Sequence, residues 1–321
     1  MHIAVLMGGV SSEREISVLS SFEITKALRC LGHQVTVIEM TEGVLSKEQE
    51  DLWFSLKIDQ IPPIEKEKKE LPLVEVLKSL SALDKVFIGL HGGRGENGII
   101  QAELESLKIS FTGSKSSACA LAMDKHKSKL LYRENGLPTP DWRVIRKNEE
   151  IEFKYPFIIK PNQEGSSVGL HLVNQESELQ EAISRALFYD QEVLVERYIE
   201  GTEYTVGILG DQALTPGGIY PKRSRLFDYQ AKYQANVTDE VFPPPDLSAE
   251  EVGTLKRLAL EAHELLGLSG YSRSDFIRER SGSFFLLETN TLPGLTKQSL
   301  LPKAAIASGI DFNALIEKIL A

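Results

Sequence analysis

The sequence predicts an α/β lobe built on a parallel sheet, followed by two α+β lobes. Three observations support this prediction. Strand, helix and strand patterns follow one another directly at the N-terminus. Short strands flank a glycine-containing loop in the middle of the chain, and a β-hairpin follows a long helix towards the C-terminus. From these changes in pattern we place the lobes at residues 1–112, 113–196 and 197–321.

The first lobe is expected to open with a strand over residues 2–7 that ends in Gly8-Gly9. Ser12 and Glu15 have the spacing of a capping box, which predicts that a helix begins there, and Gly32 is placed to end it. Residues 35–38 form the next strand. This strand-helix-strand unit is typical of the start of a parallel sheet.

A further buried strand over residues 86–90 runs into His91-Gly92-Gly93. Loops at the carboxyl ends of parallel strands are where such sheets bind ligands, so this loop and Gly8-Gly9 are candidates for close approach to a ligand. Tight turns after strands would explain both loops equally well. Residues 41–72 are poorly periodic, and we interpret their charge run, residues 65–70, as a solvated loop or helix face.

The second lobe begins with helices that run from about residue 112 through Met123 and then Asn135. A strand over residues 157–160, a loop over 162–169, a strand over 170–173 and a helix over 176–187 follow. This order predicts an α+β unit built around a glycine-containing turn.

The third lobe is expected to contain strands over residues 193–196 and 204–209, the first of them at the lobe boundary. A long irregular stretch over residues 220–245 separates them from a helix over residues 249–266. A hairpin then pairs residues 271–278 with residues 284–290 through a turn near Ser281-Gly282.

The bulk composition excludes several classes of partner. The net charge of -10 argues against a general affinity for nucleic acid or anionic membrane surfaces. We find neither a secretion signal nor an apolar run near the roughly 18 residues that a bilayer span needs. Cys30 and Cys119 lack metal-ligand spacing, so we interpret both as buried thiols in a reducing cytoplasm.

The predicted hairpin carries the sharpest chemical signal. Strand alternation sends Glu288 and Asn290 to one face and Leu287 to the other, and the paired strand adds Asp275 and Arg273. Asp275, Glu288 and Asn290 would offer oxygen ligands to Mg²⁺ while Arg273 faces substrate. The alternative is an exposed sheet face with ordinary polar residues.

Residues 164–169, Glu-Gly-Ser-Ser-Val-Gly, follow the strand that ends in Lys160-Pro161. Small residues and backbone N–H groups would let phosphate oxygens approach closely, although Gly-Ser turns are commonly inert and Lys160 would equally suit the surface. The chain has neither a Walker A motif nor Gly-x-Gly-x-x-Gly after its first strand. Its histidines have no zinc-ligand spacing.

Residues 227–233 lie in a loop, at about residues 220–240, that is too aromatic and too charged for an idle linker. A lid that closes over the site is one interpretation. The other is that Tyr229 and Tyr233 anchor a long loop by burial.

In order along the chain, these motifs resemble the D-alanine:D-alanine ligase family of ATP-grasp enzymes from end to end. The matching stretches are Gly8-Gly9, Ser12 to Glu15, Leu90-His91-Gly92, Met123-Asp124-Lys125, Ile159-Lys160-Pro161, Glu164 to Gly169, Glu196, Glu203 to Val206, Tyr229 to Tyr233, Arg273-x-Asp275, Glu288 to Gly294 and Ser299-Leu300. Gln230 and Lys297 depart from the family pattern. The resemblance implies a Rossmann-like first lobe, with the second and third lobes clasping ATP.

The resemblance also implies the ligands of the nucleotide. It assigns to ATP the residues Lys125, Lys160, Glu196 and Glu203, with Tyr198 and Ile199 near the adenine and Lys232 at the terminal phosphate. Asp275, Glu288 and Asn290 would hold two Mg²⁺ ions, for which Mn²⁺ would substitute.

For the amino acids, the resemblance implies that Glu13 anchors the ammonium of the first D-alanine, with Ser166 and Tyr233 linking it to the lid. Arg273 and the backbone N–H of Gly294 would stabilise the tetrahedral intermediate. The residues implied in binding substrate are Glu13, His91, Arg273, Gly294, Ser299 and Leu300, the last two at the second carboxylate.

The implied reaction joins two D-alanines, with ATP converted to ADP and phosphate through a D-alanyl phosphate, and supplies the dipeptide for peptidoglycan precursors. We expect a cytoplasmic enzyme, and family members are commonly homodimers. Three alternatives stay open: another ATP-grasp carboxylate-amine ligase, a nucleotide-binding regulator without catalysis, and a nicotinamide oxidoreductase. The other ligase is disfavoured by the presence of Glu13, Tyr233 and Ser299, and the regulator by the presence of Arg273 and the metal ligands. The oxidoreductase is disfavoured because the glycine fingerprint is missing.

Overall fold

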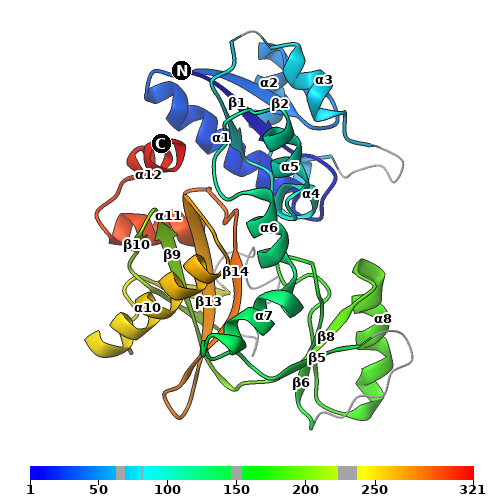
Figure 1. The fold of residues 1–321 in the computed structure, drawn as a ribbon, viewed down its shortest axis with the longest axis vertical. Helices are drawn as coiled ribbons and strands as arrows, with labels where there is room; N and C mark the ends of the chain where they lie inside the picture. Colours follow the sequence, from blue (N-terminus) through cyan, green and yellow to red (C-terminus); the bar gives the residue numbers. More distant parts are fainter. Residues whose placement is uncertain (63–68, 81, 146–153, 223–236) are drawn as a thin grey trace.

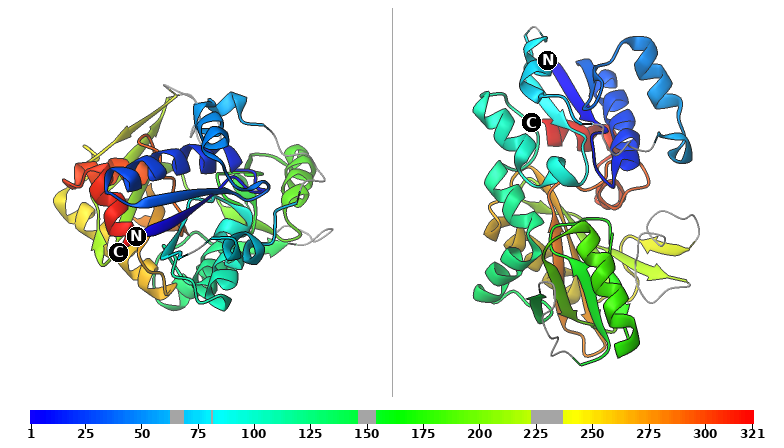
Figure 2. Two further views of the ribbon diagram at one scale, coloured as in Figure 1. Left: turned by 90° about the horizontal axis from the view of Figure 1, so that it is seen from above. Right: turned by 90° about the vertical axis from the view of Figure 1, so that its right-hand side faces the viewer.

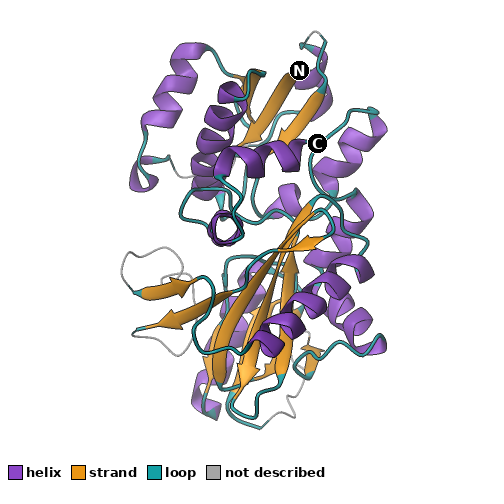
Figure 3. Ribbon diagram, turned by 90° about the vertical axis from the view of Figure 1, so that its left-hand side faces the viewer, coloured by secondary structure: helices purple, strands orange, loops and turns teal. Residues whose placement is uncertain are grey.

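The computed structural model describes residues 1–62, 69–80, 82–145, 154–222 and 237–321. Its strands form three sheets, one in the upper part of the molecule in Figure 1 and two side by side below it. The same separation is visible in the view of Figure 3, where the strands are orange.

The first sheet is largely parallel, as the N-terminal pattern predicts. Its strand order is β3-β2-β1-β4, and β1 runs parallel to both of its neighbours. The strands are β1 (His2–Met7), β2 (Gln34–Glu39), β3 (Gly43–Val44) and β4 (Lys85–Ile88). The helices around them are α1 (Arg14–Cys30), α2 (Lys47–Ser55), η1 (Ile58–Gln60), α3 (Leu73–Lys78), α4 (Gly93–Glu96) and α5 (Ile99–Ser106).

The start of α1 differs from the prediction. The helix begins at Arg14 with Glu13 at the N-cap, and no side chain caps it, so Ser12 and Glu15 form no capping box. The reason is that Glu13 turns away from the helix towards the loop at Ser166. A complete capping box occurs instead at Ser46 and Gln49 of α2, within the stretch that is poorly periodic in sequence.

The second sheet has the strand order β5-β8-β6-β7, with every neighbouring pair antiparallel. Helices α6 (Ser116–Met123) and α7 (Lys125–Glu134) lead into it. Its elements are β5 (Trp142–Ile145), β6 (Phe157–Pro161), β7 (His171–Val173), η2 (Glu176–Glu178), α8 (Leu179–Tyr189) and β8 (Val193–Arg197). Apolar residues of α8 pack against β6 and β8, as the predicted α+β unit requires.

The third sheet has the order β12-β11-β9-β13-β14, and β10 pairs with β9. Its strands are β9 (Gly201–Leu209), β10 (Gln212–Ala213), β11 (Gly217–Pro221), β12 (Thr238–Val241), β13 (Tyr271–Glu279) and β14 (Phe284–Asn290). Helix α10 (Ala249–Leu265) packs on one face of this sheet. In the right-hand view of Figure 2, β11 and β12 extend outward from the rest of the sheet.

The predicted hairpin is confirmed as β13 and β14, but its alternation is interrupted. The register shifts between Asp275 and Phe276, so that Leu287 has no partner on β13. Because this β-bulge adds one residue to β14, Leu286 rather than Leu287 is buried in the core with Thr289. Glu288 and Asn290 still share a face, as predicted.

The chain ends by returning to the first sheet. Helices α11 (Leu300–Ala307) and α12 (Phe312–Leu320) contribute Leu301, Leu315 and Ile319 to the same apolar core as Ile3. The C-terminal helices therefore pack against the first sheet, and the two termini lie in the same part of the molecule (Figure 1).

Of the two cysteines that we predicted to be buried, only one is buried. Cys119 is buried, but Cys30 is exposed at the last turn of α1, so the prediction of two buried thiols is wrong for Cys30. Across the ranges that the structure describes, no helix combines the length and apolar character needed to cross a membrane.

A buried ion pair stabilises the loop between β1 and α1. Arg14 Nη1 lies 2.6 Å from Glu39 Oε1 and donates to the carbonyl of Gly9 at 2.8 Å. The backbone N–H of Gly9 also donates to Glu39 Oε1, at 3.2 Å. Because both side chains are almost fully buried, each charge depends on the other.

We expect Glu39→Gln to lower the free energy of unfolding by about 3 to 5 kcal/mol, because it leaves the Arg14 guanidinium buried without its counter-charge. Urea denaturation followed by circular dichroism measures the loss. Asp51→Asn, which breaks the exposed Lys47–Asp51 pair, is the control and should change stability by about 0.5 kcal/mol or less. Equal effects of the two substitutions would contradict the prediction.

Candidate active site

A pocket of about 250 Å³ lies where the first and third sheets meet the loop at residues 164–169. It collects most of the residues predicted to bind or react with substrate. Those that line it are Glu13, His91, Ser166, Arg273, Glu288, Asn290, Gly294, Ser299 and Leu300.

Glu13 enters this pocket between two glycines. A Cβ atom at Gly92 would lie 2.8 Å from Glu13 Oε2, and one at Gly165 would lie 2.6 Å from the same oxygen. The carboxylate can therefore occupy this position only because both residues lack a side chain. Ser166 Oγ donates to Glu13 Oε1, from a residue with a φ of 48° in the left-handed region. Such strain in a non-glycine residue is common at functional sites.

Glu70 holds together the two loops that flank Glu13. It accepts a hydrogen bond from the N–H of Val10 at 2.8 Å and one from Arg94 Nη1 at 2.6 Å. The interpretation of the charge run as a solvated face is therefore wrong for Glu70. Lys69 is exposed, as that interpretation expects, and the residues at positions 65–68 lie outside the described residues.

His91 uses both ring nitrogens within the protein. Nδ1 lies 2.9 Å from the carbonyl of Leu292, which accepts only, and Nε2 lies 3.0 Å from Ser20 Oγ. Nδ1 therefore carries a proton and donates it to the Leu292 carbonyl. Ser20 Oγ also accepts a hydrogen bond from the backbone N–H of Leu295 at 3.3 Å. The imidazole links the first lobe to the loop after β14, and its contact with substrate stays a prediction.

The structure joins Arg273 and Asp275 in a two-point ion pair on the pocket side of the hairpin. Arg273 Nε and Nη2 lie 2.9 Å and 2.7 Å from the two carboxylate oxygens. Asp275 accepts two further hydrogen bonds, one from Thr205 Oγ1 at 2.7 Å and one from Asn290 Nδ2 at 3.2 Å. Asp275 itself is therefore held behind Arg273 and does not line the pocket.

Glu288 pairs with a cation from a different element. Lys125 Nζ, at the first turn of α7, lies 3.2 Å from Glu288 Oε2 and donates to the carbonyl of Glu164 at 2.6 Å. Burial is the largest influence on Glu164 and raises the pKa of its side chain. Lys125 thus connects the hairpin to the loop that covers Glu13.

The donor set on the hairpin fits Mg²⁺. Asp275 and Glu288 are register partners, and Asn290 adds an amide oxygen on the same face, which are the hard oxygen ligands that Mg²⁺ prefers. Within the described ranges no cluster of three or more His, Cys, Asp or Glu side chains is arranged around a metal position. A metal here would accordingly depend on two carboxylates, Asn290 and oxygens of a bound ligand.

Lys160 and Glu196, which the resemblance assigns to ATP, contact each other in the structure, and a buried lysine, Lys129, joins them. Lys160 Nζ lies 3.0 Å from one oxygen of Glu196, and the fully buried Lys129 lies 2.7 Å from the other. Burial opposes ionisation of Glu196, but the ammonium groups of Lys129 and Lys160 outweigh it and hold the pKa of this carboxyl below its usual range. Two ammonium groups therefore contact this one buried carboxylate.

A periodicity signal for Lys129 exists in the sequence. It lies four residues after Lys125, and residues with this spacing share one face of a helix. The residues around them are polar, so the pattern alone did not distinguish a buried lysine from a solvated one.

The remaining nucleotide residues lie away from the pocket lining. Ile199 is buried, and Tyr198 and Glu203 are half-buried, on or beside β9. Lys232, Tyr233 and the departure at Gln230 lie outside the described residues.

Ser299, which also lines the pocket, lies directly before α11. A Cβ atom at Gly294 would lie 2.8 Å from Ser299 Oγ, so glycine is needed for this approach. Thr296 Oγ1 lies 2.8 Å from the same hydroxyl. The arrangement places a hydroxyl beside a helix N-terminus, which favours a carboxylate. Lys297, the second departure, lies 3.4 Å from Glu23 on α1 and does not line the pocket.

Sequence reasoning missed several lining residues. Glu96 follows the His91 loop on α4, Ile58 comes from η1, and Glu240 on β12 is held by Lys303 of α11 at 2.8 Å. A charged loop, a short helix and an edge strand carry no local pattern that indicates a pocket, because only the tertiary fold brings them together.

Solved structures of similar architecture match the whole chain. The D-alanine–D-alanine ligase of Bacillus anthracis complexed with ATP has a TM-score of 0.79 and 31% identity, covering 100% of this chain and 96% of that one. The ligase of Coxiella burnetii has a TM-score of 0.81 and 26% identity, covering 100% and 92%. The arrangement of the three sheets is that of an ATP-grasp enzyme.

Sequence comparisons narrow this class to one family. The models "D-ala D-ala ligase N-terminus" and "D-ala D-ala ligase C-terminus" match residues 2–114 and 131–321. The D-alanine–D-alanine ligases of Alkalilimnicola ehrlichii and Geobacter sulfurreducens are each 39% identical over 99% of this chain, which covers 93% and 92% of their lengths. The chain belongs to the D-alanine–D-alanine ligase family.

We expect Glu196→Gln to lower the free energy of unfolding by about 3 to 5 kcal/mol, because Lys129 and Lys160 would then face each other without a buried anion. Calorimetric and chemical denaturation measure the effect. The matched control is Glu279→Gln, which removes the partly exposed partner of the neighbouring Arg197 and should cost about 1 kcal/mol at most. If Glu196→Gln lowers the free energy of unfolding no more than the control does, Glu196 does not balance the buried charges of Lys129 and Lys160.

Proposed function

We infer that this chain joins two D-alanines into a dipeptide while ATP is converted to ADP and phosphate, supplying a peptidoglycan precursor. The observation that carries this inference is the pocket of about 250 Å³, which is lined by the Glu13 carboxylate, Arg273 and the Ser299 hydroxyl. The Glu13 carboxylate suits an ammonium group of a ligand, and Arg273 with the Ser299 hydroxyl suits a carboxylate. The volume suits two small amino acids, and membership of the family supports the same reaction.

The first D-alanine would bind with its ammonium on Glu13, whose position Ser166 fixes. The second would place its carboxylate at Ser299 and the N–H of Leu300, at the start of α11. Tyr233 belongs to our proposal as the residue that links the first subsite to the lid at about residues 220–240. His91 contributes by holding the loop after β14 against the first lobe.

ATP would bind on Lys125, Lys160, Glu196 and Glu203, with Lys232 at the terminal phosphate and Tyr198 and Ile199 near the adenine. Asp275, Glu288 and Asn290 would hold two Mg²⁺ ions, or Mn²⁺ in their place. When bound, these ions would neutralise the charge that develops on the phosphate oxygens during transfer.

The chemistry requires two substitution steps, each of which forms one bond and breaks another. An oxygen of the first carboxylate attacks the γ-phosphorus of ATP, and ADP leaves, which gives the D-alanyl phosphate. The amine of the second D-alanine then attacks the carbonyl carbon, loses a proton and expels phosphate. Arg273 and the N–H of Gly294, both at the pocket, would stabilise the oxyanion of the tetrahedral intermediate.

Three further features belong to the proposal. We divide the chain into a Rossmann-like lobe (1–112), a central lobe (113–196) and a C-terminal lobe (197–321), and we assign the enzyme to the cytoplasm. Free thiols at Cys30 and Cys119 agree with that compartment. We also propose a homodimer, which light scattering on the purified protein would test.

An assay of phosphate release tests the substrate directly. The protein is incubated with ATP, Mg²⁺ and one of three additions: D-alanine, L-alanine, or D-alanine plus D-lactate. The products are identified by mass. We expect release with D-alanine alone and a D-alanyl-D-alanine product. Release only with another amino or hydroxy acid would overturn the substrate while leaving the ATP-grasp fold intact.

We expect Arg273→Ala to lower kcat by about 10² to 10³-fold, because one donor to the oxyanion is lost. Affinity for ATP, measured by calorimetry, should change little, since Arg273 is not assigned to the nucleotide. Arg278→Ala is the control: Arg278 lies on the same strand outside the pocket and pairs with Glu251. An unchanged kcat in Arg273→Ala would remove this residue from the mechanism.

A further inference from the structure

A chain of three hydroxyls lies on the face of the hairpin opposite the candidate active site. Tyr132 of α7 donates from its hydroxyl to Thr289 Oγ1 at 3.0 Å, and Thr289 Oγ1 lies 2.9 Å from Ser274 Oγ. Tyr132 and Ser274 are fully buried and Thr289 is 4% exposed. Tyr132 sits in an apolar core beside Phe276 and Leu286, where its hydroxyl interacts with Thr289 and with Ser128 of its own helix.

The hydroxyls lie directly behind the candidate metal ligands. Thr289 separates Glu288 from Asn290, and Ser274 separates Arg273 from Asp275, while Ser274 and Thr289 are register partners. Successive strand residues point to opposite faces. A displacement of Thr289 therefore moves Glu288 and Asn290 with it.

The regular ladder does not fix this part of β14 by itself. β14 is the edge strand of its sheet, and the β-bulge at Leu287 interrupts the pairing next to Glu288. A bulge kinks the strand and increases its local twist. An additional constraint on Thr289 is thus needed where the ladder is weakest.

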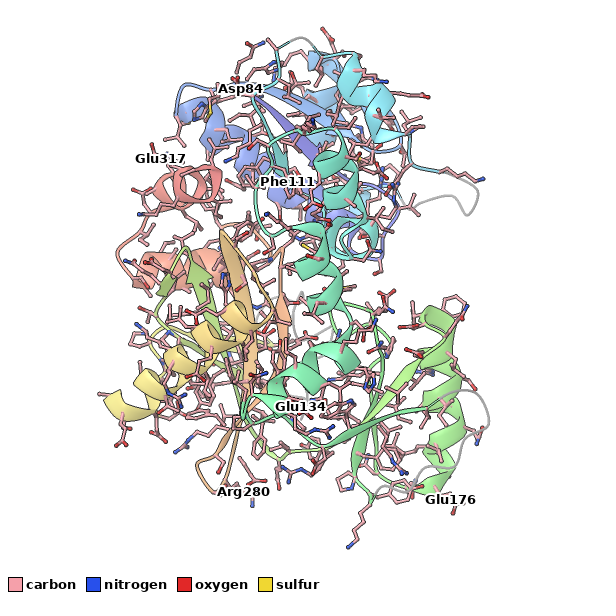
Figure 4. The ribbon with its side chains drawn as sticks, viewed as in Figure 1. Asp84, Phe111, Glu134, Glu176, Arg280 and Glu317 are labelled. Atoms are coloured by element: carbon pink, nitrogen blue, oxygen red, sulfur yellow. The ribbon has the colours of Figure 1, made fainter. Side chains whose placement is uncertain are left out.

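Helix α7 supplies this constraint from the edge of the sheet, between the two lower sheets in Figure 1. Lys125, at one end of α7, contacts Glu288, and Tyr132, two turns later, contacts Thr289. Figure 4 labels the end of the helix at Glu134 and the hairpin tip at Arg280, which lie towards the same end of the molecule. One rigid helix thereby contacts side chains from both faces of β14.

We propose that Tyr132 is a positioning residue: its hydroxyl holds Thr289 and thereby places Glu288 and Asn290 for a divalent cation bound with nucleotide. The inference rests on the proposed function, which assigns these two residues to the metal. It adds to that function a residue that touches neither metal nor substrate.

Tyr132→Phe removes one buried oxygen and keeps the aromatic ring. Outer-shell partners of metal ligands typically change metal affinity by about 10- to 100-fold, and because Tyr132 acts through Thr289 we expect the lower end, about tenfold weaker binding. Mn²⁺ binding in the presence of ADP, followed by electron paramagnetic resonance of free Mn²⁺, measures this without turnover. The Mg²⁺ concentration for half-maximal rate should rise in parallel, with the KM for D-alanine unchanged.

Two further variants separate positioning from simple loss of a buried hydrogen bond. Thr289→Val breaks the same bond from its other end and should weaken Mn²⁺ binding similarly. Ser272→Ala is the matched control, because Ser272 is buried on the same strand two residues before Ser274, yet its hydroxyl lies 2.7 Å from His263 Nδ1 on α10. It should lower the melting temperature to a similar extent while Mn²⁺ affinity stays at the wild-type value.

The outcomes are distinguishable. Wild-type affinity for Mn²⁺ in both Tyr132→Phe and Thr289→Val would overturn the inference and leave the proposed function standing. An equal loss in Ser272→Ala would also overturn it, because the effect would then be general destabilisation. A wild-type chain that binds no Mn²⁺ with ADP would sink the metal assignment itself, and the inference with it.

Discussion

Asp275 and Glu288 occupy directly facing positions on β13 and β14, and much of the site follows from the need to place two like charges there. Facing carboxylates repel each other, which destabilises a strand pair. Arg273 offsets one of them from the same strand, and Lys125 offsets the other from α7. Because the second cation comes from a helix outside the sheet, the hairpin acquires its working geometry only when α7 is docked.

The same helix transmits this requirement to the second sheet. Lys125, Lys129 and Tyr132 are spaced by four and three residues, so they share one face of α7. Lys125 reaches Glu288, Tyr132 reaches Thr289, and Lys129 reaches Glu196 of the neighbouring sheet. Charge balance at the hairpin and charge balance around Glu196 are therefore set by one rigid element between the two sheets proposed to clasp the nucleotide.

Periodicity was sufficient to predict the strands and helices but not the places where they deviate. β1, β6 and the β13–β14 hairpin have apolar patterns that need no distant partner, and they lie where expected. The start of α1 and the bulge at Leu287 differ from the prediction because both depend on distant contacts. Glu13 bonds Ser166, which is 153 residues away, and Leu286 is drawn into the core. Glu70 and Lys129 escaped prediction for the same reason: a charged residue is identified as buried only when its partner is known, and their partners lie in other elements.

The glycines that were visible in sequence acquire a specific reason from the fold. Gly92 and Gly165 belong to different lobes, yet both approach the same oxygen of Glu13, and Gly294 makes the equivalent approach to Ser299. A Cβ atom at any of these positions would meet a functional oxygen at 2.6 to 2.8 Å, closer than Cβ atoms pack. The pocket is therefore bounded by backbone where its polar groups lie. This keeps its volume near 250 Å³ and ties Glu13, the proposed ammonium subsite, to the loop at residues 164–169.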